Sequence, residues 1–260
     1  MAPDTAHKLP LIIGHRGASR EAPENTLESF RLAWDHGADG IEADFRLTAD
    51  RRIVCMHDES TGRTTGADLN IAATFLKELR RLDAGQWKGT AWSGAVIPTL
   101  DEVLDAVPDG TWLFIEIKCG AEIIAPLETV LRESGLPADR IRLLSFNAGL
   151  ITELRQRLPE WHTCWLSDYR HTLLHDTWHP SRDQVYETLG RCGAAGLASA
   201  DRAFLDGELV AGLKRQGKEV HVWTVDRLSA AQRLCRLGVD SIMTNRPGWL
   251  RQQLRKYPPP

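Results

Sequence analysis

Carboxylates at alternate positions of two apolar runs are the first residues in this sequence that could do chemistry. Glu42 and Asp44 are two positions apart in the run 40–46, and Glu116 lies within the later run 112–118. Alternate side chains of a β-strand share one face, so both acids of the first run should point the same way. If the two runs are strands of one sheet, three carboxylates converge at one place.

A cluster of three buried carboxylates needs a compensating positive charge, because each acid loses hydration and repels its neighbours. A divalent cation supplies that charge most directly. All-oxygen ligation favours a hard ion, Mg²⁺ or Ca²⁺, with Mn²⁺ also allowed. The alternative is a structural ion network in which the acids pair with Arg16, Arg46 and Lys118. We favour the cation, since barrel interiors usually carry apolar packing and buried ion networks add little stability.

Two histidines lie near the expected ends of strands. His15 and Arg16 follow the apolar run that starts at Leu11, and Arg can contact a phosphoryl group in bidentate fashion. The stretch from Arg46 to His57 is predicted to fold as a hairpin, which brings His57 beside the acids of the first run. Two histidines near a metal and a phosphate are the components of general acid/base cleavage of a phosphodiester.

Short apolar runs alternate with amphipathic helical segments along the whole chain, which is typical of a parallel sheet covered by helices. Eight such runs fit the size of a (β/α)₈ TIM barrel, whose reactive residues lie at the carboxyl ends of the strands. A ninth run, Ile53 to Met56, follows the second too closely for a crossover helix and is the hairpin partner. The eight runs are Leu11–Gly14, Gly40–Phe45, Trp112–Ile117, Ile141–Leu144, His162–Leu166, Gly196–Ala198, Val220–Thr224 and Ser241–Met243.

Capping signals mark the expected helix starts, at Asn25 with Glu28, Thr99 with Glu102, and Ser229 with Gln232. The segment 59–98 is less regular, with one predicted helix from Ala72 to Leu82 and a stretch rich in Gly and Trp from Gly85 to Gly94. We interpret it as an insertion or lid after the second strand. No composition shift divides the chain, so residues 1–260 are expected to form a single domain.

The charge, the apolar content and the cysteine spacing of the chain exclude some classes of function. The 260 residues carry a formal net charge of -3, and the pI is about 6.3, so a broad positive field for nucleic acid is absent. The sequence has no run long and apolar enough for a membrane anchor, and its first ten residues lack the apolar core of a leader. Five widely spaced cysteines without a CxxC pair are read as reduced thiols. We therefore expect a cytoplasmic protein, either a monomer or a homodimer.

Several short motifs together resemble the glycerophosphodiester phosphodiesterase family of barrel enzymes. Their order and spacing match that family over nearly the whole chain, although each motif alone is weak. The motifs are His15-Arg-Gly-Ala-Ser, Pro23-Glu-Asn-Thr, Ile41-Glu-Ala-Asp, Met56-His-Asp, Ile97-Pro-Thr-Leu, Ile115-Glu-Ile-Lys, Ser145-Phe-Asn, Val222-Trp-Thr-Val-Asp and Thr244-Asn-Arg-Pro.

The resemblance implies a (β/α)₈ barrel that hydrolyses glycerophosphodiesters to sn-glycerol 3-phosphate and an alcohol. In that reading the adjacent glycerol hydroxyl attacks phosphorus and water then opens the cyclic ester, with either histidine as the base. The resemblance also implies roles for individual residues. These are the metal ligands Glu42, Asp44 and Glu116, the acid/base pair His15 and His57, the phosphate contacts Arg16 and Lys118, and Trp223 as an aromatic wall against glycerol.

Two other functions remain open at this point. A lysophospholipid or sphingolipid substrate would need an apolar groove, to which Trp87 and Trp92 could contribute. A catalytically silent barrel that binds phosphorylated ligands would normally have lost an acid or a histidine, and this sequence retains all five. The head group, and which histidine is the acid, are left undetermined by the sequence.

Overall fold

The computed structural model describes residues 9–172 and 177–259, and eight parallel strands form a closed barrel at its centre. Strand β1 pairs with β2 on one side and with β11 on the other, which closes the sheet. The expected (β/α)₈ barrel is therefore confirmed. Its strands are β1 (Leu11–His15), β2 (Gly40–Leu47), β4 (Trp112–Ile117), β5 (Ile141–Ser145), β6 (His162–Ser167), β9 (Gly196–Ala200), β10 (Glu219–Trp223) and β11 (Ser241–Thr244).

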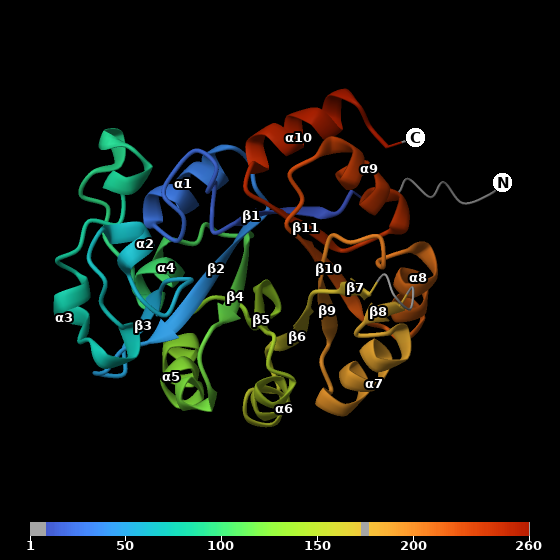
Figure 1. Cartoon of the computed structure of the whole chain (residues 1–260), viewed down its shortest axis with the longest axis horizontal. Coiled ribbons are helices and arrows are strands. Elements are labelled where there is room, and N and C mark those ends of the chain that lie inside the picture. Colours follow the sequence, from blue (N-terminus) through green and yellow to red (C-terminus); the bar gives the residue numbers. More distant parts are fainter. Residues whose placement is uncertain (1–8, 173–176, 260) are drawn as a thin grey trace.

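A helix follows each barrel strand and packs outside it, as Figure 1 shows. Alternating strand residues divide the apolar side chains into an outer core against the helices and a small inner cluster that includes Phe114, Leu144 and Met243. The helices are α1 (Leu27–Asp35), α4 (Leu100–Ala106), α5 (Ile124–Glu133), α6 (Ala148–Arg157), α7 (Arg182–Cys192), α8 (Gly207–Arg215), α9 (Leu228–Leu237) and α10 (Pro247–Lys256).

The hairpin after β2 forms as expected. Strand β3 (Ile53–Cys55) runs antiparallel to β2, and Phe45 is opposite Cys55. The backbone N–H of Met56 donates to the carbonyl of Asp44, which returns the chain to the carboxyl end of β2. His57 is thereby brought to the end of the barrel where the acids of β2 lie.

One of the three expected helix caps is confirmed and two are wrong. Thr99 and Glu102 form a reciprocal capping box at α4. The cap of α1 is Thr26 and not Asn25, because the Asn25 amide is already hydrogen-bonded to Asp44. Helix α9 begins at Leu228 after Arg227, without a side-chain cap from Ser229.

The chain between β3 and α4 packs around a small apolar cluster of its own, which includes Ile71, Leu79 and Ile97. The helix expected from Ala72 to Leu82 is wrong in extent, since extended backbone at Thr74 separates two shorter pieces and the Thr74 hydroxyl donates to the Asn70 carbonyl. The helices here are α2 (Gly62–Thr65), η1 (Ile71–Ala73), α3 (Leu76–Leu79), η2 (Gln86–Lys88) and η3 (Thr90–Trp92).

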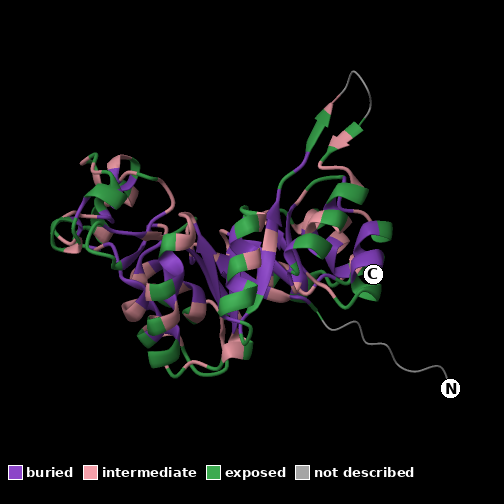
Figure 2. Cartoon of the chain, turned by 90° about the horizontal axis from the view of Figure 1, so that it is seen from below, coloured by how far each residue is buried: buried purple, intermediate pink, exposed green. Residues whose placement is uncertain are grey.

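A short hairpin between β6 and α7 projects from the barrel in Figure 2. It pairs β7 (Arg170–Thr172) with β8 (Thr177–His179), and sequence reasoning did not predict it. Across the described part of the chain, each helix is too short or too polar to span a bilayer.

Candidate active site

The three acids lie together inside the barrel. Asp44 on β2 is directly opposite Glu116 on β4, and Glu42 precedes Asp44 on the same strand face. Their exposed fractions are 1% for Glu42, 0% for Asp44 and 8% for Glu116. One carboxylate oxygen from each lies within 4.8 Å of the others. The structure thus brings together the three acids that the sequence placed on two strands.

Burial and nearby charges shift the pKa values of the three acids in different directions. Burial, followed by the charge of Asp44, raises the pKa of Glu42 to about 8 and that of Glu116 to about 7. Burial also acts to raise the pKa of Asp44, but Arg16 and Lys118 outweigh it and hold that pKa below its usual value. Without a cation, therefore, Asp44 ionises most readily of the three, and ionisation of Glu42 and Glu116 is disfavoured relative to an ordinary glutamic acid.

The donor set fits a hard divalent cation. Oε1 of Glu42 and Oδ1 of Asp44 are buried and accept no hydrogen bond from any described residue. Unsatisfied carboxylate oxygens of this kind are costly unless a cation binds them. Lys118 Nζ does lie 2.7 Å from Glu116 and 3.6 Å from Asp44, so part of the expected ion network exists.

Arg46 does not join that network. Its guanidinium donates to the carbonyl oxygens of His57 and Lys118 and so ties the hairpin to the end of β4. Arg16 does join it, with Nε 3.1 Å from Asp44 and its backbone N–H donating to Glu42. Glu42 Oε1 and Asp44 Oδ1 still accept no hydrogen bond from the described part of the chain, although Lys118 Nζ lies 3.6 Å from the second of these oxygens.

His15 is held in one tautomer by residues that the sequence analysis did not assign. Its Nδ1 lies 2.8 Å from Oδ1 of Asn245. The Asn245 amide nitrogen donates to Asp226, so the oxygen must face His15 and accept from Nδ1–H. The unprotonated Nε2 then lies on the Glu42 side, 3.9 Å from that carboxylate. Burial, assisted by Arg16, lowers the pKa of His15.

A glycine is required where the chain leaves β1. Gly17 has φ +84°, and a Cβ there would lie 2.3 Å from the hydroxyl oxygen of Ser29 in α1. Arg16 before it also has a positive φ, of 55°. This tight turn directs the Arg16 backbone N–H to Glu42 and its side chain to Asp44.

His57 lines the same pocket as His15 and pairs with a carboxylate. Its Nδ1 is 2.6 Å from Oδ1 of Asp58, and this leaves Nε2 available for proton transfer. Burial opposes ionisation of Asp58, but hydrogen bonds from Arg63 and His57 outweigh it and lower the pKa of Asp58 to about 2. Burial lowers the pKa of His57, while Asp44 and Asp58 act in the opposite direction.

Arg63 of α2 links the residues that hold Arg16 to those that hold His57, and it was not identified from the sequence. Its Nε donates to Asp58 at 2.6 Å, and its two terminal nitrogens donate to Glu24 at 3.0 and 2.7 Å. Glu24 in turn accepts from Arg16. One guanidinium thus supports both Arg16 and His57, although nothing in the local sequence pattern relates position 63 to position 24.

A pocket of about 150 Å³ connects these groups. One wall carries the cations and two of the three acids, without Asp44, and the other wall is apolar. Trp223 lies on the apolar wall, where its ring packs edge-on against Phe146 with centroids 5.7 Å apart. Phe146, at the end of β5, was not assigned from the sequence; its ring also lies 5.9 Å from Lys118 Nζ. The lining does not include Trp87 or Trp92.

A pocket of this size suits a small molecule that has one charged part and one apolar edge. The Arg16 and Lys118 side chains of the lining can bind an anion, and both histidines line the same pocket. This arrangement supports proton transfer to and from a bound phosphoester.

Comparison with known proteins identifies relatives over almost the entire chain. The sequence model of the glycerophosphoryl diester phosphodiesterase family matches residues 15–249. A glycerophosphodiester phosphodiesterase of Caldanaerobacter subterraneus is 35% identical over 251 residues, which is 95% of this chain and 98% of that protein. A glycerophosphodiester phosphodiesterase of Bacillus subtilis is 30% identical, covering 95% of this chain and 87% of that one.

Solved structures agree with these sequence matches. A phosphodiesterase of Oleispira antarctica, in complex with the product sn-glycerol 3-phosphate, superposes with a TM-score of 0.82 at 31% identity and covers 95% of this chain and 97% of that one. A glycerophosphodiester phosphodiesterase of Agrobacterium tumefaciens gives a TM-score of 0.79 at 26% identity, covering 94% of this chain and all of that one.

Proposed function

This chain belongs to the glycerophosphoryl diester phosphodiesterase family and is an enzyme of that class, and we propose that it hydrolyses glycerophosphodiesters by metal-dependent His/His acid–base catalysis. The products are sn-glycerol 3-phosphate and an alcohol. The observation that carries the proposal is a buried cluster of three carboxylates, two of whose oxygens accept no hydrogen bond from the residues that the structure describes, beside a pocket lined by two histidines whose Nδ1 atoms are both engaged.

Glu42, Asp44 and Glu116 would hold one divalent cation, Mg²⁺ or Ca²⁺, with Mn²⁺ as a third choice. A cation held by these carboxylates would supply positive charge that stabilises the negative charge developing on the phosphate. Arg16 and Lys118, at the same wall, are the proposed phosphate contacts. Trp223 is the proposed apolar contact for the glycerol carbons.

The partners of the two histidines favour His15 as the base and His57 as the acid. His15 donates to the neutral Asn245 amide and lies beside Arg16, so the cationic form is disfavoured and Nε2 is free to accept a proton. Burial lowers the pKa of His57 as well, but His57 donates to the Asp58 carboxylate, which offsets part of this and favours the imidazolium more than the neutral Asn245 amide does at His15. An imidazolium at His57 can protonate the leaving oxygen. The glycerol hydroxyl next to the phosphoester is the proposed nucleophile, and water opens the cyclic ester afterwards.

The cyclic route is tested by removing that hydroxyl from the substrate. A 2-deoxy analogue of glycerophosphocholine should bind but not turn over, and it should inhibit competitively with a Ki near the KM of the parent compound. Choline release is the measured quantity. Turnover of the analogue at the parent rate would show that water attacks phosphorus directly.

The function itself is tested by sn-glycerol 3-phosphate release from glycerophosphocholine. Protein stripped of metal is refilled separately with Mg²⁺, Ca²⁺ or Mn²⁺, and activity should return only with a cation. Lysophosphatidylcholine, assayed in parallel, tests the lipid alternative, which the small pocket and the absence of Trp87 and Trp92 from its lining make less favourable. Failure with every metal and both substrates would leave the silent phospholigand-binding barrel.

Metal affinity is expected to rise with pH, because the cation must displace protons from Glu42 and Glu116. Their pKa values of about 8 and about 7 lie above the usual 4.5 for glutamic acid. Affinity should therefore rise steeply below pH 7, more gently from 7 to 8, and level off above 8. Calorimetric titration with Mn²⁺ across this range measures it. The Glu42→Gln variant should lose the part of the slope between 7 and 8, and a wild-type affinity independent of pH would contradict the prediction.

Arg63→Ala is expected to lower kcat/KM about 10-fold without unfolding the protein. Arg63 is a positioning residue, since it contacts Glu24 and Asp58 and not the pocket. Loss of the partner of a catalytic or metal-binding group typically costs about 10- to 100-fold, and the partial exposure of this pair places the effect at the lower end. KM should rise because Glu24, which holds Arg16, loses its contact with Arg63. The value of kcat should fall because Asp58, which holds His57, loses the same partner.

Arg80→Ala is the matched control, because Arg80 also pairs with a carboxylate, that of Glu102, but outside the pocket. It should leave both kinetic constants unchanged. Arg63→Lys should restore part of the loss, since one ammonium can keep one of the two contacts. Equal kinetics for Arg63→Ala and Arg80→Ala would show that Arg63 has only a structural role.

Residues 59–98 are proposed to be an insertion that influences head-group choice, supported by Lys88 Nζ donating to the carbonyl of Ser19 in the loop after β1. The cytoplasm is the proposed location, supported by free thiols at all five cysteines, whose side chains are buried or partly buried.

A further inference from the structure

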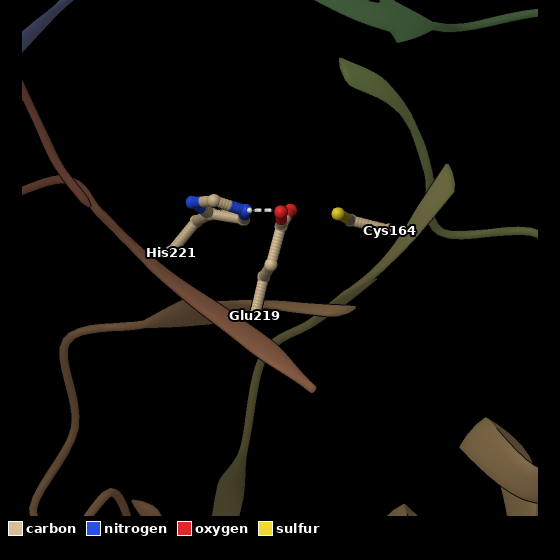
Figure 3. A group of neighbouring side chains, drawn as sticks. All are labelled: Cys164, Glu219 and His221. Atoms are coloured by element: carbon tan, nitrogen blue, oxygen red, sulfur yellow. Dashed lines mark hydrogen bonds and ion pairs between the residues drawn. The ribbon is translucent and has the colours of Figure 1, made fainter. Parts of the chain in front are cut away.

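A second cluster of metal-binding side chains lies at the opposite end of the barrel. Cys164 is the third residue of β6, and Glu219 and His221 are the first and third residues of β10. All three point inward, and Figure 3 shows the Glu219 carboxylate between the Cys164 sulfur and the His221 ring. One ligand atom from each lies within 4.8 Å of the others. None of the three lines the catalytic pocket.

A glycine makes this approach across the sheet possible. Strand β9 separates β6 from β10, and Gly196 is the residue opposite both Cys164 and Glu219. A Cβ at Gly196 would lie 2.9 Å from the Glu219 Cβ and 3.1 Å from the Cys164 sulfur. Any other residue there would fill the space between the two ligands. The absence of a side chain at 196 therefore leaves a small cradle between β6 and β10.

We propose that Cys164, Glu219 and His221 form a second metal site, which binds Zn²⁺ through one thiolate, one carboxylate and one imidazole. Zn²⁺ accepts this mixture of sulfur, nitrogen and oxygen ligands, whereas Mg²⁺ and Ca²⁺ bind oxygen. The site is distinct from the all-oxygen cluster of Glu42, Asp44 and Glu116. It does not depend on the catalytic mechanism proposed above.

The contacts around the ligands have the form of an outer coordination shell. His221 Nδ1 lies 2.8 Å from the Ser241 hydroxyl, so Nε2 is directed to the Glu219 side. Arg142 donates to both oxygens of Glu219, at 2.7 and 2.8 Å, and His162 Nδ1 lies 3.2 Å from one of them. The other oxygen lies 3.2 Å from His221 Nε2, so a metal would replace this contact between two of its own ligands. The buried Cys164 thiol has no hydrogen-bond partner among the contacts of the described residues. An ion would give this sulfur a partner.

An ion can reach the cluster from solvent. A cavity of about 620 Å³ at the amino-terminal mouth of the barrel is lined by Arg142, Glu219 and His221, together with the segment that leads into β1. It supplies both an entry route and a water for the fourth coordination position. The Arg142 charge opposes a cation, and ionisation of the Cys164 thiol on binding offsets this. Binding therefore releases one proton and tightens as pH rises.

The test uses Co²⁺ as a spectroscopic substitute for Zn²⁺. A cobalt–thiolate bond gives an intense charge-transfer absorption in the near ultraviolet, and a site with only oxygen ligands does not. We expect this absorption in the unsubstituted protein, and its loss when Zn²⁺ is added in excess. It should persist in Glu42→Gln, which weakens the catalytic cluster, and in Cys55→Ser, which removes a buried thiol close to that cluster.

Cys164→Ser and His221→Asn should each abolish or strongly weaken the absorption. In Glu42→Gln, Zn²⁺ at about 100 times its Kd should raise Tm by about 5–10 °C, and this rise should vanish when Cys164→Ser is added. If the unsubstituted protein shows no charge-transfer band, the cluster is only a buried thiol beside the Arg142–Glu219 ion pair. A band that survives Cys164→Ser, or failure of Zn²⁺ to displace Co²⁺, would equally overturn the proposal.

Discussion

Replacing His57 with alanine is expected to lower kcat for glycerophosphocholine about 10²- to 10⁴-fold, the usual contribution of a general acid or base. The metal affinity should change little, because the proposed ligands of the ion are the three carboxylates and His57 is not one of the ligands. His36→Ala is a suitable control, since His36 is half-buried beside Glu21 and does not line the pocket. It should retain full activity.

The roles of the two histidines can then be distinguished by changing the leaving group of the substrate. If His57 is the acid, a glycerophosphodiester with a p-nitrophenolate leaving group needs little protonation, and His57→Ala should lose far less activity on it. His15→Ala should lose a similar factor on both substrates, because the attacking hydroxyl is the same. The reverse pattern would exchange the two roles, and full activity of His57→Ala on glycerophosphocholine would exclude His57 from the chemistry.

Glu42→Gln is expected to reduce activity about 10²- to 10⁴-fold at subsaturating metal, because a Lewis acid contributes several kcal/mol to the transition state. The same change should not destabilise the metal-free protein. The pKa of Glu42, about 8, lies above its usual 4.5, so the fold favours the protonated acid and the unfolded chain favours the ionised one. Its contribution to stability is thus complete below pH 4.5 and is lost as pH rises through 8.

Glutamine keeps the shape of the protonated acid and cannot ionise. The metal-free variant should therefore match the wild type in Tm at low pH and exceed it increasingly as pH rises toward 8. Thermal unfolding in a chelator, over a series of pH values, measures the difference. A variant that loses Tm at every pH would show that Glu42 stabilises the fold as an anion, in which case it would not be a site poised for a cation.

The parts of the site that depend on alternation within a strand could be predicted from the sequence. Glu42 and Asp44 share a face because they are two residues apart, and Glu116 joins them because β4 is adjacent to β2. The eight strands were found within a few residues of their bounds, because their apolar runs are separated by clear helical patterns.

Contacts between distant elements could not be predicted in this way. Asn245 acts on His15 because β11 is adjacent to β1, and that adjacency is a property of barrel closure and not of local pattern. Arg63 reaches Glu24 because a short helix of the segment after β3 lies against the loop that follows β1. The Cys164 cluster needs the register of three strands and a glycine in the middle one. The predicted helix cap at Asn25 was wrong because the Asn25 side chain is hydrogen-bonded to Asp44.

The hydrogen bond between His15 and Asn245 joins residues 230 positions apart. The first site residue to leave a ribosome therefore acquires its proton-accepting geometry only when the last strand, β11, and Asn245 directly after it have emerged. A nascent or truncated chain that ends before β11 would contain all three acids and both histidines, yet nothing would orient the His15 ring. Activity should consequently appear in one step when β11 docks against β1, and it would report closure of the barrel during synthesis more sharply than secondary structure does.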